Sequence, residues 1–454
     1  MSSNTPGHFK KRIFRAGTWT MAGFVSSQLI RLGGNLILTR LLVPEMFGVM
    51  AIVTVLIAGV TLFSDIGLLQ NIVRSKRGDD PVFLNTAWSV QILRGFLIAL
   101  LAFFLSWALY YVGTLGLIPE NSTYSEPILP YIIAVMAITP IIAGFNSTKY
   151  LVASRKLQLG RVTIIELSSQ AIGLTVMIVW AFFEQTIWLL VVGSFISITA
   201  KMILTHLVLK GANNRFAWDK DAFHEIFHFG KWIFISSILG FILSKGDKLL
   251  LGGLISSEML GIYTIAYFLA FAAIQALSKL CMSVFFPALS EVVRERPNDL
   301  KKVYYKIRTK IDAIAFLVAG LLFMSGELII QTLYDERYYE AGWMLEYLSI
   351  SIIGIGYVLS SQTILALGDA KIISAINFFH ALALFILIPI FFHLFGIAGA
   401  IWAIPASSLV RIAGMVWYFH KHNLLVVFKE IQMVPMFFVG SGVGWLATIL
   451  FSTN

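Results

Sequence analysis

The chain has 454 residues, of which 58% are hydrophobic and only 13% are charged, and its mean hydropathy is +0.83. These values exclude an ordinary soluble domain and indicate a membrane protein. A formal net charge of +10 would suggest nucleic-acid binding in a soluble protein. In a membrane protein, basic cytoplasmic loops explain such a charge, so no nucleic-acid partner is expected.

Long apolar runs follow one another along the chain and predict an all-α integral membrane protein. Runs of roughly 18 or more residues are long enough to cross a bilayer as helices. Helices are required because backbone polar groups find no water in hydrocarbon, and the alternating pattern of barrel strands is absent. The runs number thirteen and cover residues 15–37, 47–69, 86–112, 129–147, 162–182, 187–209, 232–251, 261–286, 311–333, 341–366, 372–394, 397–418 and 434–451.

Basic residues in the loops predict the orientation of these helices. Of the 34 Lys and Arg residues, 25 lie in the N-terminal segment and in alternate loops, whereas the opposite loops contain only Arg40 and Arg337. The N-terminus is therefore expected in the cytoplasm. The polar stretch 210–231 mixes charges with large apolar residues, and we interpret it as an amphipathic helix on the inner surface.

The start of the chain reappears 213 positions later, so that Gly17-Thr18-Trp19 aligns with Gly230-Lys231-Trp232 and Glu45 aligns with Glu258. Such duplications build transporters whose substrate site lies where the repeats meet. Each half has an even number of predicted crossings, so the repeats are parallel. The pattern predicts two pseudo-symmetric six-helix lobes around a central cavity. The expected domains are an N-lobe at 1–209, a linker at 210–231, a C-lobe at 232–418 and an additional C-terminal transmembrane helix within 419–454.

Seven basic residues fall inside the apolar runs. A cation in hydrocarbon costs about 2.5–3.5 kcal/mol on insertion scales, so these side chains should face a watery cavity or a partner. Four of them lie roughly 10–13 Å from the cytoplasmic ends of their helices, where snorkelling or helix packing is an equal alternative. Three lie roughly 20–24 Å deep, and for these the alternative is anchoring at the outer interface. The shallow residues are Arg94, Lys201, Lys279 and Arg411, and the deep residues are Arg31, Lys245 and Lys248.

Polar stripes accompany the deep cations. Gln28 and Asn35 lie on one helical face with Arg31, and in the second repeat Ser244 aligns with Arg31 and Lys248 with Asn35. Polar stripes on two symmetry-related helices indicate the walls of a shared cavity.

Acidic residues within the runs have two interpretations each. Asp247 could neutralise the neighbouring lysines or take part in cation coupling, and Asp65 could couple a cation or cap a helix end. Asp312 and three glutamates near helix ends are expected to be interfacial. His380 is expected to be packed and hydrogen-bonded rather than to relay protons.

No enzyme, metal or cofactor is expected. The single cysteine, Cys281, excludes an intrachain disulfide, and one Cys with eight scattered His residues does not form a metal cluster. Neither a phosphate loop nor a nucleophile–base pair is visible. A chain without disulfides or a targeting segment is expected in a bacterial inner membrane.

Two motifs carry a family resemblance. The segment Arg40-Leu41-Leu42-Val43-Pro44-Glu45-Met46-Phe47-Gly48, followed by Phe63-Ser64-Asp65-Ile66-Gly67-Leu68, resembles the N-terminal signature of polysaccharide exporters and Wzx-type oligosaccharide flippases. In the first motif, Pro44 suits the first turn of a helix and Gly48 allows close helix approach. The resemblance implies the fold of the multidrug/oligosaccharidyl-lipid/polysaccharide (MOP) superfamily. Its members usually have twelve or fourteen helices, so thirteen runs leave the side of the C-terminus open.

The resemblance implies a flippase for a polyprenyl-diphosphate-linked oligosaccharide that works by alternating access. The alternative is a cation-coupled exporter of drugs or other small molecules with the same fold. Because cations outnumber acids inside the runs, charge favours the anionic lipid-linked substrate. Further implied partners are membrane lipid, a polysaccharide polymerase or export machinery, and H⁺ or Na⁺ if transport is coupled to an ion.

Overall fold

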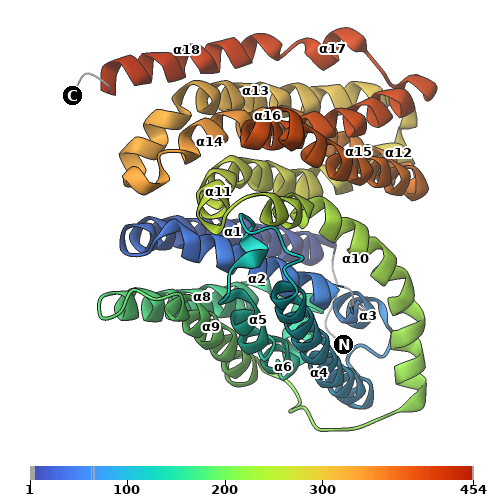
Figure 1. Ribbon diagram of the computed structural model, residues 1–454. Coiled ribbons are helices and arrows are strands. Elements are labelled where there is room, and N and C mark those ends of the chain that lie inside the picture. Colours follow the sequence, from blue (N-terminus) through green and yellow to red (C-terminus); the bar gives the residue numbers. More distant parts are fainter. Residues whose placement is uncertain (1–5, 63, 65–66, 452–454) are drawn as a thin grey trace. The chain divides into compact units, whose positions relative to one another are not determined.

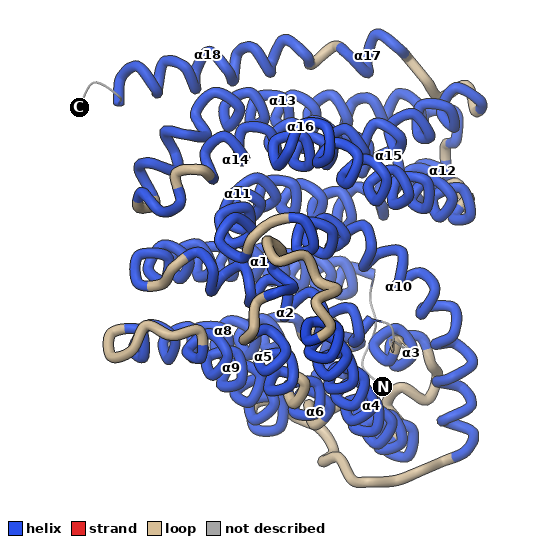
Figure 2. Tube along the Cα trace, in the orientation of Figure 1, coloured by secondary structure: helices blue, strands red, loops and turns tan. Residues whose placement is uncertain are grey.

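The computed structural model describes residues 6–62, 64 and 67–451, and every regular element within these ranges is a helix (Figures 1 and 2). Nine helices of the described part are long and apolar enough to cross a membrane. The number rises to ten if the bent pair Leu129–Gly144 and Lys149–Arg155 forms one span. The chain is therefore an all-helical, multi-pass membrane protein.

The helices divide into two compact units. Unit 1 comprises residues 1–42, 52–120 and 124–241, and unit 2 comprises residues 43–51, 121–123 and 242–454. The long helix α10 (Lys220–Leu254) passes from the first unit into the second.

Unit 1 is built from helices that pack as neighbours along the chain and across it. Helix α8 packs between α1 and α9, and α4 packs against α5 and α6 (Figure 1). The short helices α3 and α7 pack against each other, and α2 begins in unit 2 and continues into unit 1 from Ile52 onwards. The bounds are α1 (Pro6–Leu41), α2 (Pro44–Leu62), α3 (Leu68–Arg74), α4 (Pro81–Thr114), α5 (Leu129–Met136), α6 (Thr139–Gly144), α7 (Lys149–Arg155), α8 (Leu159–Ala181) and α9 (Trp188–Leu207).

Unit 2 is centred on α13, against which α14 and α18 pack along their lengths (Figure 1). Tyr304, Leu359 and Phe419 belong to its buried apolar core. A π-helical turn at Cys281–Phe285 joins α11 to α12, and a 3-10 turn at Ile350–Ile355 joins α14 to α15. The bounds are α11 (Ser257–Leu280), α12 (Phe286–Glu295), α13 (Leu300–Leu333), α14 (Ala341–Ser349), α15 (Gly356–Ala366), α16 (Ala370–Lys421), α17 (Val427–Ile431) and α18 (Val434–Phe451).

Local sequence explains where several helices begin. Pro44 is the first residue of α2, as the motif predicted, because a helix start does not need the missing N–H. Asp80 caps α4 by accepting a 3.0 Å hydrogen bond from the backbone N–H of Val82. Ser256 caps α11 in the same way, accepting from the N–H of Met259 at 3.3 Å.

The duplication is visible in the helix bounds. Helix α1 ends at Leu41 and α2 begins at Pro44, while α10 ends at Leu254 and α11 begins at Ser257, so both boundaries repeat with the offset of 213 seen in the sequence. Within unit 2, the aligned residues Gly48 and Gly261 form a close crossing of α2 and α11. A Cβ at Gly48 would collide with the carbonyl oxygen of Ser257, and one at Gly261 with that of Pro44.

Three features account for the difference between thirteen apolar runs and nine or ten spanning helices. The runs 372–394 and 397–418 both lie in the 52-residue helix α16, which breaks at Gly396, where φ is 63°. The bent pair contains the run 129–147. The remaining two runs lie in α1 and α10, whose apolar residues are interrupted by the polar and charged positions singled out above.

Two expected boundaries are corrected. The run 47–69 is not one helix, because α2 ends at Leu62 and α3 begins at Leu68. The stretch 210–231 is not one amphipathic helix, because α10 begins only at Lys220. The preceding residues are held extended along α4, where backbone N–H groups of Arg215 and Ala217 donate to the side chains of Asn85 and Ser89.

Candidate functional site

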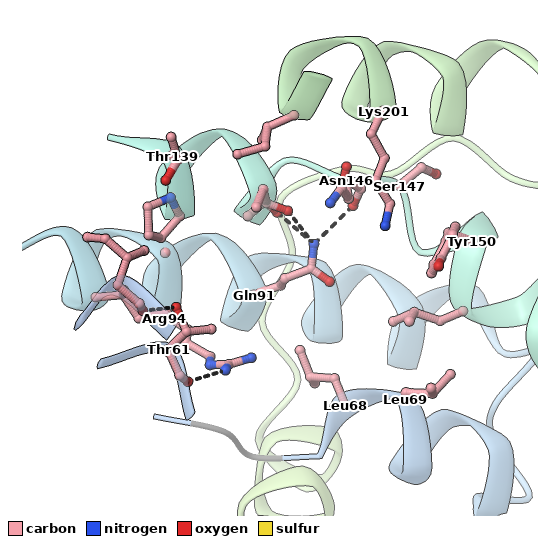
Figure 3. Close-up of a pocket in the computed structure, with 18 of the residues that line it drawn as sticks. Thr61, Leu68, Leu69, Gln91, Arg94, Thr139, Asn146, Ser147, Tyr150 and Lys201 are labelled. Carbon is pink, nitrogen blue, oxygen red and sulfur yellow. Dashed lines mark hydrogen bonds between the residues drawn. The ribbon is translucent and has the colours of Figure 1, made fainter. Parts of the chain in front are cut away.

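Unit 1 contains a cavity of about 520 Å³ bounded by α2, α3, α4, α6, α7 and α9 (Figure 3). Two of the seven predicted cavity cations, Arg94 on α4 and Lys201 on α9, line it together. Gln91, Asn146 and Tyr150 add polar groups to the wall. No acidic side chain lines this cavity within the part of the chain that the structure describes. The cavity is therefore suited to a negatively charged ligand.

Arg94 is oriented by the end of α2. Its Nη2 donates to the carbonyl oxygen of Thr61 at 2.8 Å (Figure 3). Its Nε donates to Oγ of Ser64 at 3.2 Å. The last carbonyl groups of a helix have no partner within the helix, and the guanidinium supplies one here. This contact holds a cation at a fixed place on the cavity wall.

Gln91 lies one turn before Arg94 on α4 and closes the end of α6. Its Nε2 donates to the carbonyl oxygens of Gly144 at 2.8 Å, Asn146 at 3.1 Å and Ala143 at 3.4 Å, and these bonds appear as the dashed fan in Figure 3. The segment that follows α6 is thereby fixed against α4. The side-chain oxygen Oδ1 of Asn146 is buried and has no hydrogen-bond partner among the described residues.

Lys201 enters the cavity from α9. Its Nζ lies 4.8 Å from the centroid of the Tyr150 ring and 3.7 Å from Oε1 of Glu166. The Tyr150 hydroxyl also donates a short hydrogen bond to Glu166. The lysine and the glutamate are both partly exposed, so this long ion pair is weak and leaves most of the ammonium charge available.

Unit 2 brings together a second group of predicted residues, from α10 and α16. Asp247 and Arg411 line a cavity of about 190 Å³ together with His380. The carboxylate of Asp247 accepts a 2.5 Å hydrogen bond from Tyr263 and lies 3.6 Å from Nζ of the buried Lys248. The same Nζ lies 3.1 Å from the centroid of the Tyr267 ring, which supplies a cation–π contact.

The other predicted site residues line neither of these two cavities. Arg31 and Ser244 are exposed, whereas the remaining ones are partly buried. Asp65 lies outside the described residues. The partly buried residues are Gln28, Asn35, Lys245 and Lys279.

A buried charge cluster in unit 2 was missed by sequence reasoning. Arg308 was counted among the basic residues of a cytoplasmic loop, but it lies within helix α13, one turn before Asp312. Both residues are buried, with 2% of their surface exposed. Nε of Arg308 contacts Oδ2 of Asp312 at 3.1 Å, and Nη2 contacts Oε2 of Glu430 at 2.6 Å. The i, i+4 spacing of the first pair on one helix was the available signal.

The family comparison finds one matching family model, described as "Polysaccharide biosynthesis protein", over residues 37–342. The lipopolysaccharide biosynthesis protein WzxC of Escherichia coli (strain K12) is 21% identical over 295 residues, which are 64% of this chain and 57% of WzxC. The chain thus matches little more than half the length of that relative. The teichuronic acid biosynthesis protein TuaB of Bacillus subtilis (strain 168) is 23% identical over 336 residues, 71% of this chain and 68% of TuaB.

Among solved structures, the lipid II flippase MurJ in an inward closed conformation has a TM-score of 0.69 with this chain at 15% sequence identity. The alignment covers 96% of this chain and 98% of MurJ. At this identity the likeness establishes the fold alone, and the fold is MurJ-like.

Proposed function

We propose that this chain, which belongs to the family of polysaccharide biosynthesis proteins, is a membrane transporter whose substrate is a polyprenyl-diphosphate-linked oligosaccharide. The oligosaccharide would be a repeat unit of O-antigen, capsule or exopolysaccharide, carried from the inner to the outer leaflet of a bacterial inner membrane by alternating access. The relatives of lipopolysaccharide and teichuronic acid biosynthesis support a glycan, and the lipid II flippase of like fold supports a lipid-linked one.

The proposal rests on one observation: Arg94 and Lys201 line the same cavity, and no carboxylate is found among its described lining residues. A diphosphate carries several negative charges, and charge-assisted hydrogen bonds to guanidinium and ammonium groups are its strongest protein contacts. Arg94 offers a planar fork that its contacts with α2 hold in place, and Lys201 offers a compact point charge. Together they would hold the diphosphate while the lipid tail remains in the bilayer.

Charge also separates this substrate from the alternative, a cationic drug exported by a transporter of the same superfamily. A site for cations needs net negative charge, because like charges repel the ligand. The described lining of the unit 1 cavity carries two positive charges, which favours an anion.

The other predicted residues have proposed roles. Arg31 in unit 1, and Lys245, Lys248, Lys279 and Arg411 in unit 2, would supply further positive charge for an anionic substrate, with Gln28, Asn35 and Ser244 as neutral hydrogen-bonding groups. Asp247 would bind the coupling ion, H⁺ or Na⁺, because its carboxylate is buried and bonded to Tyr263 and Lys248. Asp65 is the second candidate for that role.

Export by cavity variants tests the proposal. We expect Arg94→Ala and Lys201→Ala each to reduce surface polysaccharide about tenfold or more, since a charge-assisted hydrogen bond contributes about 1.5–3 kcal/mol. Lipid-linked oligosaccharide should accumulate on the cytoplasmic leaflet, as measured by its accessibility in inverted vesicles. Arg94→Lys should retain part of the activity, because a point charge still attracts phosphate.

The matched control is Lys302→Ala, which removes an exposed lysine that lines neither cavity and should leave export unchanged. All variants are compared at equal amounts of protein in the membrane. Normal surface polysaccharide in the double variant Arg94→Ala, Lys201→Ala would contradict the proposal. Drug resistance that depends on the wild-type gene, together with normal polysaccharide, would favour the exporter.

A further inference from the structure

A second basic cavity lies in unit 1, where α4 begins and α9 ends. Its volume is about 360 Å³. Four basic side chains and one acidic side chain line it, so its described lining carries a net charge of +3. The basic loops place this cavity on the predicted cytoplasmic side. Its charged residues are Lys149, Lys156, Arg161, Lys210 and Asp79.

Helix α7 separates this cavity from the cavity of Arg94 and Lys201. Lys149, Val152, Ala153 and Lys156 follow the spacing of one helical face and line the second cavity. Tyr150 and Leu151, on the other face, line the first. The two cavities are therefore distinct sites that share one short helix.

Lys149 is buried in the wall of the second cavity, with 8% of its surface exposed. Its ammonium donates to Oδ1 of Asn213 at 2.9 Å and to the carbonyl oxygen of His206 at 3.3 Å. Both acceptors are neutral. A buried ammonium without a carboxylate is unfavourable, and an anion in the cavity would compensate it.

The one acidic residue of the cavity does not meet this need. Asp79 is bonded to Nζ of Lys156 at 2.8 Å and lies 3.4 Å from Nε of Arg155. The hydrogen bond from Lys156 and the charge of Arg155 hold the pKa of Asp79 below its ordinary value, so it remains a carboxylate that neutralises these neighbours. Arg161 and Lys210 are exposed and have no partner among the described residues, and they remain to face a ligand with Lys149.

We propose that this cavity binds the phosphate headgroup of an anionic phospholipid from the cytoplasmic leaflet. Basic pockets between transmembrane helices on the cytoplasmic side are suited to such headgroups. The choice of a lipid over free phosphate rests on the apolar surface of the adjoining helices. Leu207 and Val208 at the end of α9 are 76% and 41% exposed, and Ile164 on α8 is 49% exposed. These side chains would contact the acyl chains of a lipid whose headgroup occupies the cavity.

Native mass spectrometry of the full-length protein tests the proposal, with phosphatidylglycerol and cardiolipin as anionic probes and phosphatidylcholine as the neutral one. We expect the wild type to retain the anionic lipids at least about tenfold more tightly than phosphatidylcholine. The double variant Arg161→Gln, Lys210→Gln should lose this preference. Both residues are exposed, so the variant should fold normally.

The matched control is Arg215→Gln, Lys220→Gln, which removes one exposed charge before α10 and one at its first residue, neither of which lines the cavity. This variant should keep the preference for anionic lipids within about twofold of the wild type. An equal loss of preference in both double variants would show that general surface charge, and not this cavity, causes the preference, and would overturn the proposal. Displacement of the lipid by millimolar inorganic phosphate would also overturn it, because the site would then recognise the phosphate alone.

A stability measurement gives a second readout. We expect phosphatidylglycerol to raise the thermal midpoint of the wild type, and Lys149→Met to abolish this increase because no buried ammonium remains to be compensated. The same increase in Lys149→Met and the wild type would count against the proposal. Occupancy of this site does not depend on which substrate the transporter carries.

Discussion

At the scale of single residues, the guanidinium of Arg308 in unit 2 is buried and has contacts on several sides. Besides its two carboxylate partners, its Nη1 contacts the Tyr304 hydroxyl at 2.5 Å and Ser360 Oγ at 3.1 Å. The Tyr305 hydroxyl donates to Glu430 at 2.7 Å and accepts from the N–H of Val426 at 2.8 Å. This network attaches the segment of α17 to α13, so one guanidinium holds together parts of the chain that are far apart in sequence.

The substitution Arg308→Met should strongly destabilise unit 2, because it leaves two buried carboxylates without a cation. Losses of about 3–5 kcal/mol are typical when one partner of a buried ion pair is removed. The buried thiol of Cys281 provides the measurement, since it reacts with a fluorescent maleimide only when unit 2 opens on heating. The temperature at which it reacts should fall clearly in the variant.

Two further variants serve as the control and as the test of compensation for Arg308→Met. Arg294→Met removes an arginine whose side chain is 71% exposed and should leave the reaction temperature unchanged. The triple variant Arg308→Met, Asp312→Asn, Glu430→Gln should recover much of the loss, because neutral side chains of similar shape need no cation. An unchanged temperature in Arg308→Met would show that the cluster does not stabilise the fold.

At the scale of elements, the crossing of α2 and α11 in unit 2 depends on two glycines from aligned positions of the repeat. Each glycine meets the backbone of the other helix, Gly48 at Ser257 and Gly261 at Pro44. Backbone atoms cannot move aside as a side chain can. The contact therefore allows no side chain at either position, which explains why the motif has glycine there in both halves.

Replacing Gly48 or Gly261 by Val should separate the two helices and lower stability. Overpacking costs about 1–3 kcal/mol in ordinary cores, and the upper part of this range is expected where the obstacle is backbone. The thermal midpoint and the amount of folded protein in the membrane are the measurements. Gly442→Ala on α18 is the control, because a Cβ there would meet nothing within 4 Å. Equal stability of Gly48→Val and the control would contradict the crossing.

At the scale of the whole molecule, the distribution of basic residues predicts the orientation of the helices in the membrane. The bias of 25 basic residues against two predicts the side of every loop. Reporter domains fused after Asp79 or Asn298 should be active only in the cytoplasm, and reporters fused after Glu120 or Ser257 only outside. Reversal of any two of these four positions would overturn the predicted topology.

The sequence by itself determined the class of the protein, most of its helices and the repeat. Each residue of a spanning helix that faces lipid must be apolar or have a polar partner, so the apolar runs are visible in the sequence alone. The helix start at Pro44 and the repeat with an offset of 213 are likewise properties of the sequence. The sequence predicted helix ends less accurately where side chains of another helix, instead of carbonyl groups of the same helix, accept hydrogen bonds from the backbone. The segment before α10, held to α4 by Asn85 and Ser89, is an example.

Only the tertiary structure decided which charged residues meet. Arg94 and Lys201 were two of the four shallow candidates, for which snorkelling or helix packing was an equal alternative, until the packing of α4, α6 and α9 placed them on one cavity. Glu430 reaches Arg308 across 122 positions of sequence, which no periodicity encodes. A hydropathy pattern records that a residue is charged, whereas the free energy of that charge depends on the side chains that surround it, and these are set by helix packing.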